Sequence, residues 1–211
     1  LKPNRLEAAK NVASEFIAAR PNDNIGLTIF AGEAFTQCPM TTDHVSLINL
    51  LQSVRTDIAA RGLISDGTAL GMGLANAVSR LKDSKAKSKV VILLTDGSNN
   101  MGDISPMTAA QIAQSMGIRV YTIAVGTNKV APYPMPVGGT IQYVNIPVDI
   151  DTKTLSDIAA TTEGNFYRAT NTKELKRIYQ DIDKLETTKM NVKKFSKHYE
   201  AYQPFAIAAI I

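Results

Sequence analysis

A run of five apolar residues from Val90 to Leu94, followed by Thr95, Asp96 and Gly97, constrains the fold of this chain more than any other feature. A strand without polar alternation is buried on both faces, which is typical of a parallel sheet covered by helices. Ligand sites of open α/β sheets lie at the carboxyl ends of the strands. Asp96 is therefore a candidate to hold a cation, to accept a phosphoryl group or to orient water.

Strands and helices alternate along the rest of the chain. This order predicts a three-layer α/β fold, with a mostly parallel, doubly wound sheet and helices on both faces. One short edge strand is expected to end at Pro39, because proline cannot donate to a strand ladder. The predicted strands are 25–31, 34–38, 89–95, 118–125 and 164–168, and the predicted helices are 3–19, 43–54, 70–81, 105–116, 154–160 and 172–185.

The composition predicts one domain with an appendage. The 211 residues are 45% hydrophobic and 20% charged, which is enough for one well-packed core and too short for two full domains. We assign residues 1–188 to the domain. Residues 127–149 contain three prolines and a Gly-Gly pair, and we expect them to form an excursion built on a surface hairpin. Residues 189–211 form the appendage.

The appendage has the order of a membrane boundary. Four lysines between residues 189 and 197 precede two tyrosines, and the segment Phe205–Ile211 is purely apolar. This order predicts a basic juxtamembrane segment and the start of a membrane span, of which about 20 residues are needed to cross a bilayer. The alternative is an ordinary buried strand or helix end. The net charge of +4 comes without a basic patch interleaved with aromatic residues, so we expect no nucleic-acid partner. The single cysteine, Cys38, excludes an internal disulfide framework.

An enzyme that uses Asp96 is the alternative reading of the strand end. A hydrolase with an aspartate nucleophile would need a second acid two residues later, where this chain has Ser98. A phospho-receiver would need an acidic pair after the first strand, and none is present. Gly67, Gly71 and Gly73 form no phosphate-binding fingerprint, and the last two favour close helix packing instead. A hydrolase or phosphotransferase that uses Asp96 therefore remains the runner-up.

Thr68 and Asp96 fit a divalent cation site better than they fit an enzyme active site. Thr68 and Asp96 both follow turns that we expect at the same edge of the sheet, and both offer the hard oxygen that Mg²⁺ prefers. Asn99, Asn100 and Asp103 are either further oxygen ligands or members of a polar loop with an Asx turn.

Four segments together resemble a von Willebrand factor type A domain. The resemblance covers nearly the whole chain, and the segment 175–189 with the excursion around Ala131 resembles more narrowly the BatA branch, the Bacteroides aerotolerance membrane proteins. The four segments are Asp66–Gly71, Val90–Gly97, Ile118–Gly126 and Gly164–Ala169.

The resemblance implies a metal-ion-dependent adhesion site. Such a site uses an Asp-x-Ser-x-Ser pattern after the first strand, a threonine from a second loop and an aspartate from a third, and a carboxylate of the partner completes the metal shell. Thr68 matches the second element and Asp96 the third, whereas no Asp-x-Ser-x-Ser occurs in this sequence. The native first strand is therefore expected to be absent. We expect a divalent cation, Mg²⁺ before Mn²⁺ or Ca²⁺, in the intact protein, and poor Mg²⁺ binding by this chain alone.

The resemblance also implies a biological setting. It favours a non-enzymatic protein–protein interaction domain of a membrane-anchored bacterial protein linked to aerotolerance and stress resistance, with other Bat proteins and a MoxR-type ATPase as candidate partners. The family suggests the periplasmic side of the inner membrane, whereas the lysines beside the tail favour the cytoplasm. A scaffold without metal, acting through the proline-rich excursion, is a third reading.

The absent strand has a structural consequence. In this fold it would lie between the strands at 25–31 and 89–95, and without it two rows of backbone groups would lack partners, at about 1–3 kcal/mol for each buried group. We expect the apolar tail Phe205–Ile211 to occupy the position, within its own chain or swapped into a neighbour as a dimer.

Overall fold

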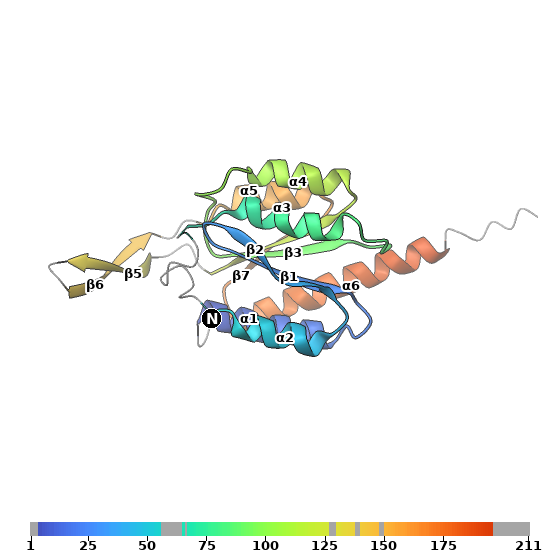
Figure 1. The fold of residues 1–211 in the computed structure, drawn as a ribbon, viewed down its shortest axis with the longest axis horizontal. Coiled ribbons are helices and arrows are strands. Elements are labelled where there is room, and N and C mark those ends of the chain that lie inside the picture. The colour runs from blue at the N-terminus through green and yellow to red at the C-terminus, as the bar shows by residue number, and fades with distance from the viewer. Residues whose placement is uncertain are drawn as a thin grey trace, which may run out of the picture.

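The chain folds into a sheet between two layers of helices. The computed structural model describes residues 4–55, 65, 67–126, 130–137, 140–147 and 150–195. Figure 1 shows α3, α4 and α5 on one face of the sheet and α1, α2 and α6 on the other. The elements in chain order are α1 (Arg5–Ala18), β1 (Ile25–Phe30), β2 (Ala34–Thr41), α2 (His44–Ser53), α3 (Leu70–Leu81), β3 (Val90–Thr95), α4 (Pro106–Ser115), β4 (Arg119–Val125), β5 (Val130–Val137), β6 (Thr140–Pro147), α5 (Thr152–Thr161), β7 (Phe166–Ala169) and α6 (Thr172–Phe195).

Three parallel strands form the centre of the sheet, in the order β3-β4-β7. Thr95 at the end of β3 is in register with Ala124, and Val125 of β4 is in register with Ala169 of β7. Alternate residues of β4 are buried against opposite helix layers: Val120 belongs to the cluster with α3, α4 and α5, and Tyr121 to the cluster with α1 and α6. The predicted α/β class with a largely parallel sheet is confirmed.

A break separates β3 from the hairpin β1-β2. Among the described residues, β3 pairs only with β4, and β1 pairs only with the antiparallel β2. All six residues of β1 are partly exposed, and so are Val90, Ile92 and Leu94 of β3. The break lies where the sequence predicted a missing strand. The tail expected to fill it lies outside the described residues, so that part stays a prediction.

Side-chain caps begin most of the helices. Asn4 accepts a hydrogen bond from the Glu7 backbone N–H at 2.8 Å, and Asp43 accepts one from Ser46 at 3.1 Å. These contacts satisfy backbone donors that a helix leaves unpaired at its first turn. α6 begins in the same way, with Asn171 Oδ1 accepting a hydrogen bond from the Glu174 N–H at 2.9 Å.

Two element boundaries differ from the prediction. β2 continues through Pro39 to Thr41, and the register between β1 and β2 shifts there. Proline is tolerated because the residue is exposed on a strand with one partner, at an irregularity in the ladder. α6 continues ten residues past the predicted end at Leu185, through the assigned domain boundary at residue 188.

The proline-rich segment forms the expected hairpin. β5 and β6 pair antiparallel with Val137 opposite Thr140, and Figure 1 shows them projecting away from the helix layers. β5 follows the end of β4, so the hairpin leaves the sheet at the edge where Asp96 lies. In the part of the chain that the structure describes, no helix is both long and apolar enough to cross a bilayer.

Candidate metal edge

Asp96 lies directly after β3, where the chain turns out of the sheet. The turn is held by Thr95, whose Oγ1 accepts a hydrogen bond from the Gly97 backbone N–H at 3.2 Å. The side chain of Asp96 is 56% exposed, so its carboxylate reaches solvent while the strand behind it is fixed in the core. This is the strand-end position that the sequence predicted.

The Thr68 loop is tied to the loop that follows Asp96 by reciprocal hydrogen bonds. The Thr68 backbone N–H donates to Asn100 Oδ1 at 2.8 Å, and the Asn100 N–H donates to the Thr68 carbonyl at 3.0 Å. Asn99 Oδ1 accepts from the Gly71 N–H at 3.3 Å. Asn99 and Asn100 therefore connect two loops through their amide oxygens, which are occupied by backbone donors.

These ties place the Thr68 hydroxyl beside the residue after Asp96. A Cβ built on Gly97 would lie 3.3 Å from Thr68 Oγ1. The Ala69 N–H also donates to the Ala31 carbonyl at 2.6 Å, so the loop after β1 meets the same rim. Thr68 and Asp96 thus lie at one edge of the sheet, and glycine at position 97 leaves the room for their approach.

Arg5 is the functional-site residue that the sequence analysis missed. Its Nη1 donates to Asp96 Oδ2 at 2.9 Å, although the two residues are 91 positions apart. The guanidinium also lies against Gly126 at the end of β4, with Nε 3.5 Å from the position of a Cβ built there. Arg5 is the first residue of α1, and nothing in its local sequence indicates which strand end it contacts.

The donor set fits a hard divalent cation in part. A threonine hydroxyl and an aspartate carboxylate are oxygen ligands of the kind that Mg²⁺ uses, and both lie at a solvent-accessible edge. Within the described ranges, no group of three or more His, Cys, Asp or Glu side chains could hold a metal ion. Thr68 and Asp96 would therefore supply two ligands of a larger oxygen shell.

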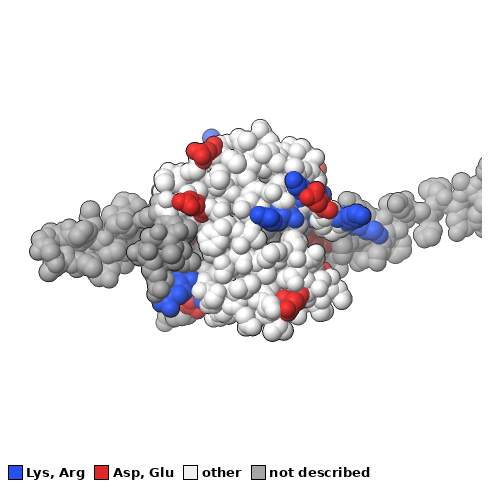
Figure 2. Space-filling model, viewed as in Figure 1, with Lys and Arg blue, Asp and Glu red and all other residues white. Residues whose placement is uncertain are grey.

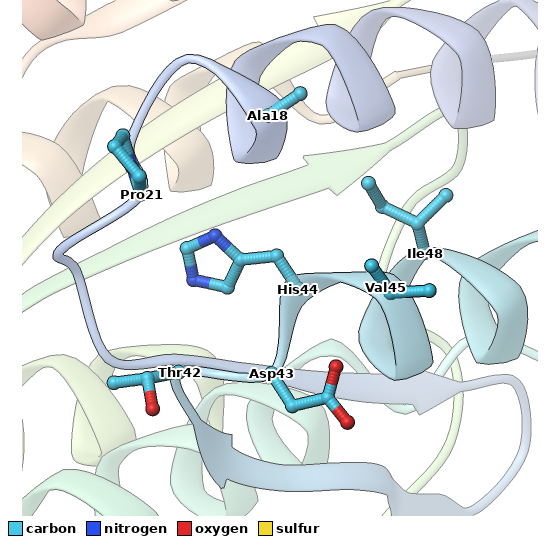
Figure 3. Close-up of a pocket in the computed structure, with 7 residues that line it drawn as sticks. All are labelled: Ala18, Pro21, Thr42, Asp43, His44, Val45 and Ile48. Carbon is cyan, nitrogen blue, oxygen red and sulfur yellow. The ribbon is translucent and has the colours of Figure 1, made fainter.

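A surface pocket lies far from this edge. It has a volume of 380 Å³ and is lined by Ala18, Pro21, Thr42, Asp43, His44, Val45 and Ile48, and Figure 3 shows the His44 ring within it. His44 Nε2 forms a hydrogen bond with the Asp23 carbonyl at 2.8 Å. Arg5 and Ala18 begin and end α1, so the pocket lies at the other end of this helix from Arg5, about 20 Å away along the helix at 1.5 Å per residue. It contains none of the candidate ligands.

A buried polar cluster lies at the opposite end of the strands. Glu186 of α6 accepts hydrogen bonds from Ser88 at 2.8 Å, from Arg119 at 2.5 Å and from the Tyr121 hydroxyl at 2.5 Å. Burial and the Glu186 hydrogen bond raise the pKa of Tyr121 well above its usual range. Burial alone would raise the pKa of Glu186, but its three hydrogen bonds and the charge of Arg119 outweigh that effect and lower it. The cluster fixes α6 to the sheet.

Charged side chains are scattered over the face of the molecule in Figure 2. Basic and acidic residues lie singly or beside one another there, separated by uncharged surface. The described residues of this face therefore present no continuous basic surface.

Comparison with known proteins places this architecture in one family. A family model described as von Willebrand factor type A domain matches residues 3–181. An uncharacterized protein of Borreliella burgdorferi is 30% identical over 207 residues, which are 98% of this chain and 59% of that protein. The chain thus spans little more than half the length of the curated relatives it matches.

Solved structures show the same fold. BatB from Bacteroides thetaiotaomicron superposes with a TM-score of 0.73 at 32% identity, covering 89% of this chain and 91% of that one. An aerotolerance-related membrane protein from Bacteroides fragilis, with multiple mutations to serines, gives 0.70 at 27% identity, covering 86% and 89%. Proximal thread matrix protein 1 from the mussel byssus, with a zinc-occupied MIDAS motif, gives 0.64 at 25% identity, covering 87% and 41%.

Proposed function

Because the chain belongs to the von Willebrand factor type A family, we propose that it is a protein–protein interaction domain that binds an acidic residue of a partner through a divalent cation. The cation lies at the edge formed by Thr68 and Asp96, and Mg²⁺ is its preferred identity. The observation that carries the proposal is the juxtaposition of the Thr68 hydroxyl with the Asp96 turn at the carboxyl ends of the strands.

The chemistry of the edge follows from its charges. A bound divalent cation supplies positive charge and an open coordination position for a carboxylate. Asp96 balances part of that charge, and the Thr68 hydroxyl supplies a neutral oxygen from the neighbouring loop. The Asn99 and Asn100 bonds hold the two loops in a fixed relation, which reduces the entropy lost when an ion binds. The zinc-occupied MIDAS motif of the mussel byssus protein supports a metal site in a domain of this fold.

We place the domain in a membrane-anchored bacterial protein of the Bat type. The neighbours BatB and the aerotolerance-related membrane protein support this setting. Other Bat proteins and a MoxR-type ATPase are the candidate partners, and the periplasmic side of the inner membrane is the proposed location. The domain performs no catalysis in this proposal.

The test is a calorimetric titration of Mn²⁺ and Mg²⁺ into the protein at its natural length. Asp96→Asn and Thr68→Ala should each lower cation affinity by about tenfold or more, which corresponds to roughly 1.4 kcal/mol. Asp157→Asn is the matched control, because it removes the same charge from an exposed position of α5, outside the Thr68 loop and the loop after Asp96. Equal affinity in the wild-type protein and Asp96→Asn would contradict the proposal.

A phosphatase assay distinguishes the proposed function from the alternative, a hydrolase or phosphotransferase that uses Asp96. The proposal predicts no turnover of a phosphate monoester by the wild-type protein. If the wild-type protein hydrolyses the ester and Asp96→Asn abolishes this turnover, the protein is an enzyme and the proposed function is wrong.

A further inference from the structure

The geometry of Arg5 points to a role that deepens, and rests on, the proposed metal edge. We propose that Arg5 is a built-in counter-cation of Asp96 that competes with the divalent ion, so that the ion must displace the guanidinium to bind. Arg5 is in this sense a positioning residue, since it acts on the ion through Asp96.

The contact itself is the first observation. Arg5 Nη1 lies 2.9 Å from Asp96 Oδ2, a charge-assisted hydrogen bond between groups of opposite charge. The Arg5 side chain is 39% exposed and the Asp96 side chain 56%, so both can exchange this contact for another without unfolding the core. The contact offsets the negative charge of Asp96.

The position of Arg5 on its helix is the second observation. Arg5 is the first residue of α1, following the Asn4 cap, and its charge therefore lies at the positive end of the helix dipole. Basic residues are disfavoured there, and Asp96 offsets that repulsion. The Asp96 carboxylate thus stabilises the positive charge of Arg5, which the dipole of α1 destabilises.

The placement of the guanidinium is the third observation. It spans the ends of two neighbouring strands, from Asp96 after β3 to Gly126 after β4, where the Gly126 N–H donates to the Ala169 carbonyl of β7 at 2.8 Å. Thr68 Oγ1 lies 3.3 Å from a Cβ built on Gly97, the residue that follows Asp96. An ion held by Thr68 and Asp96 would therefore share a carboxylate with Arg5 and would be repelled by it.

Two consequences follow for binding. The ion loses affinity because it must compete with Arg5 for Asp96 and because two positive charges then lie close together. Once released, the guanidinium lies beside the ion with its remaining donors free to face an incoming carboxylate. At low cation concentration Arg5 offsets the charge of Asp96.

The experiment compares cation affinities of variants of the natural-length protein. Mn²⁺ is titrated while its paramagnetic broadening of the Thr68 and Gly97 amide signals is followed by NMR. Arg5→Gln should bind Mn²⁺ about fivefold more tightly than the wild-type protein, since an exposed ion pair and the added repulsion are each of modest size. Arg5→Lys, which keeps the charge, should remain near the wild-type affinity.

Arg80→Gln is the matched control. It removes one positive charge from an arginine of α3 whose Nε donates to Thr36, on a different part of the surface. It should leave Mn²⁺ affinity unchanged, which separates a local effect from a change in net charge. A thermal melt of each variant checks that the fold is retained.

The possible outcomes test the role of Arg5 separately from the proposed metal site on which it rests. Equal or weaker Mn²⁺ binding by Arg5→Gln, with broadening still centred on Thr68 and Gly97, overturns the competition and leaves the metal edge in place. Absence of broadening at these amides in every variant overturns the metal edge itself.

Discussion

At the scale of single residues, short polar contacts decide where the loops of the edge lie. The Asn100 side-chain oxygen accepts from the Thr68 N–H, and the Asn100 backbone N–H donates to the Thr68 carbonyl. Asn99 Oδ1 accepts from Gly71 in the first turn of α3. The sequence analysis left these two asparagines open as ligands or as loop residues. Their amide oxygens accept backbone hydrogen bonds, so in this structure they support the loop that carries Thr68.

Glu186 gives a residue-scale prediction about stability. Glu186→Gln should lower the free energy of unfolding at pH 7 by about 3 kcal/mol, because it leaves the partly buried Arg119 without a charged partner. Urea denaturation followed by circular dichroism measures the change. Glu15→Gln, which breaks the exposed pair with Lys176, is the control and should change stability by less than about 1 kcal/mol.

The same residue predicts a pH dependence. The pKa of Glu186 is lowered in the folded protein from its ordinary value of 4.5. Its contribution to stability is therefore fully present above pH 4.5 and is lost as the pH falls through the folded pKa. The difference in stability between the wild-type protein and Glu186→Gln should shrink over that acidic range. A constant difference down to the acid transition would contradict this assignment.

At the scale of elements, close packing of α3 fixes the loop before α4. A Cβ on Gly71 would lie 2.0 Å from the Ile104 carbonyl oxygen, so the helix and the loop approach at backbone distance. The prediction that Gly71 permits close packing is confirmed. The packing partner is the loop backbone rather than a second helix, which periodicity alone does not reveal.

Gly71→Ala should therefore destabilise the protein although alanine is the better helix former. We expect overpacking to cost about 2–3 kcal/mol, because the clash is with backbone, and this outweighs the roughly 1 kcal/mol gained in helix propensity. Thermal denaturation measures it. Ser79→Ala on the exposed part of the same helix is the control and should change stability by about 0.5 kcal/mol or less. A Gly71→Ala protein as stable as the control would show that the loop moves freely.

At the scale of the whole molecule, the main feature of the sheet is the break between β1 and β3. Two strands with partly exposed apolar side chains each lack a second partner among the described residues. The helices on both faces still cover the sheet on either side of the break, as Figure 1 shows. The fold thus keeps its layers while one position in the sheet stays open to a strand.

We predict that the apolar tail supplies this strand. Replacing Ile207, Ile210 and Ile211 by serine should lower the unfolding free energy by about 2 kcal/mol or more, because backbone groups of β1 and β3 lose partners. Hydrogen exchange should also show weaker protection of β3 amides in the variant. Light scattering separates a tail placed in its own chain from a swapped dimer. Unchanged stability and exchange would exclude the tail from the sheet.

The sequence by itself determined the class of fold and most of its elements. The apolar run before Asp96, the buried run 118–125 and the helix caps Asp43 and Ser105 act locally, through burial and backbone hydrogen bonds. It also predicted Thr68 and Asp96 at one edge, because each lies in a turn from which the chain leaves that edge for a helix.

The tertiary structure alone decided the partner of Asp96 and the neighbours of Thr68. The contact of Arg5 with Asp96 spans 91 residues, and that of Glu186 with Tyr121 spans 65. Such contacts depend on how helices are placed across the sheet, and no local pattern encodes that placement. The type of a residue determines the kind of partner that it can bind. The packing of the helix layers on the sheet determines which particular residue becomes that partner.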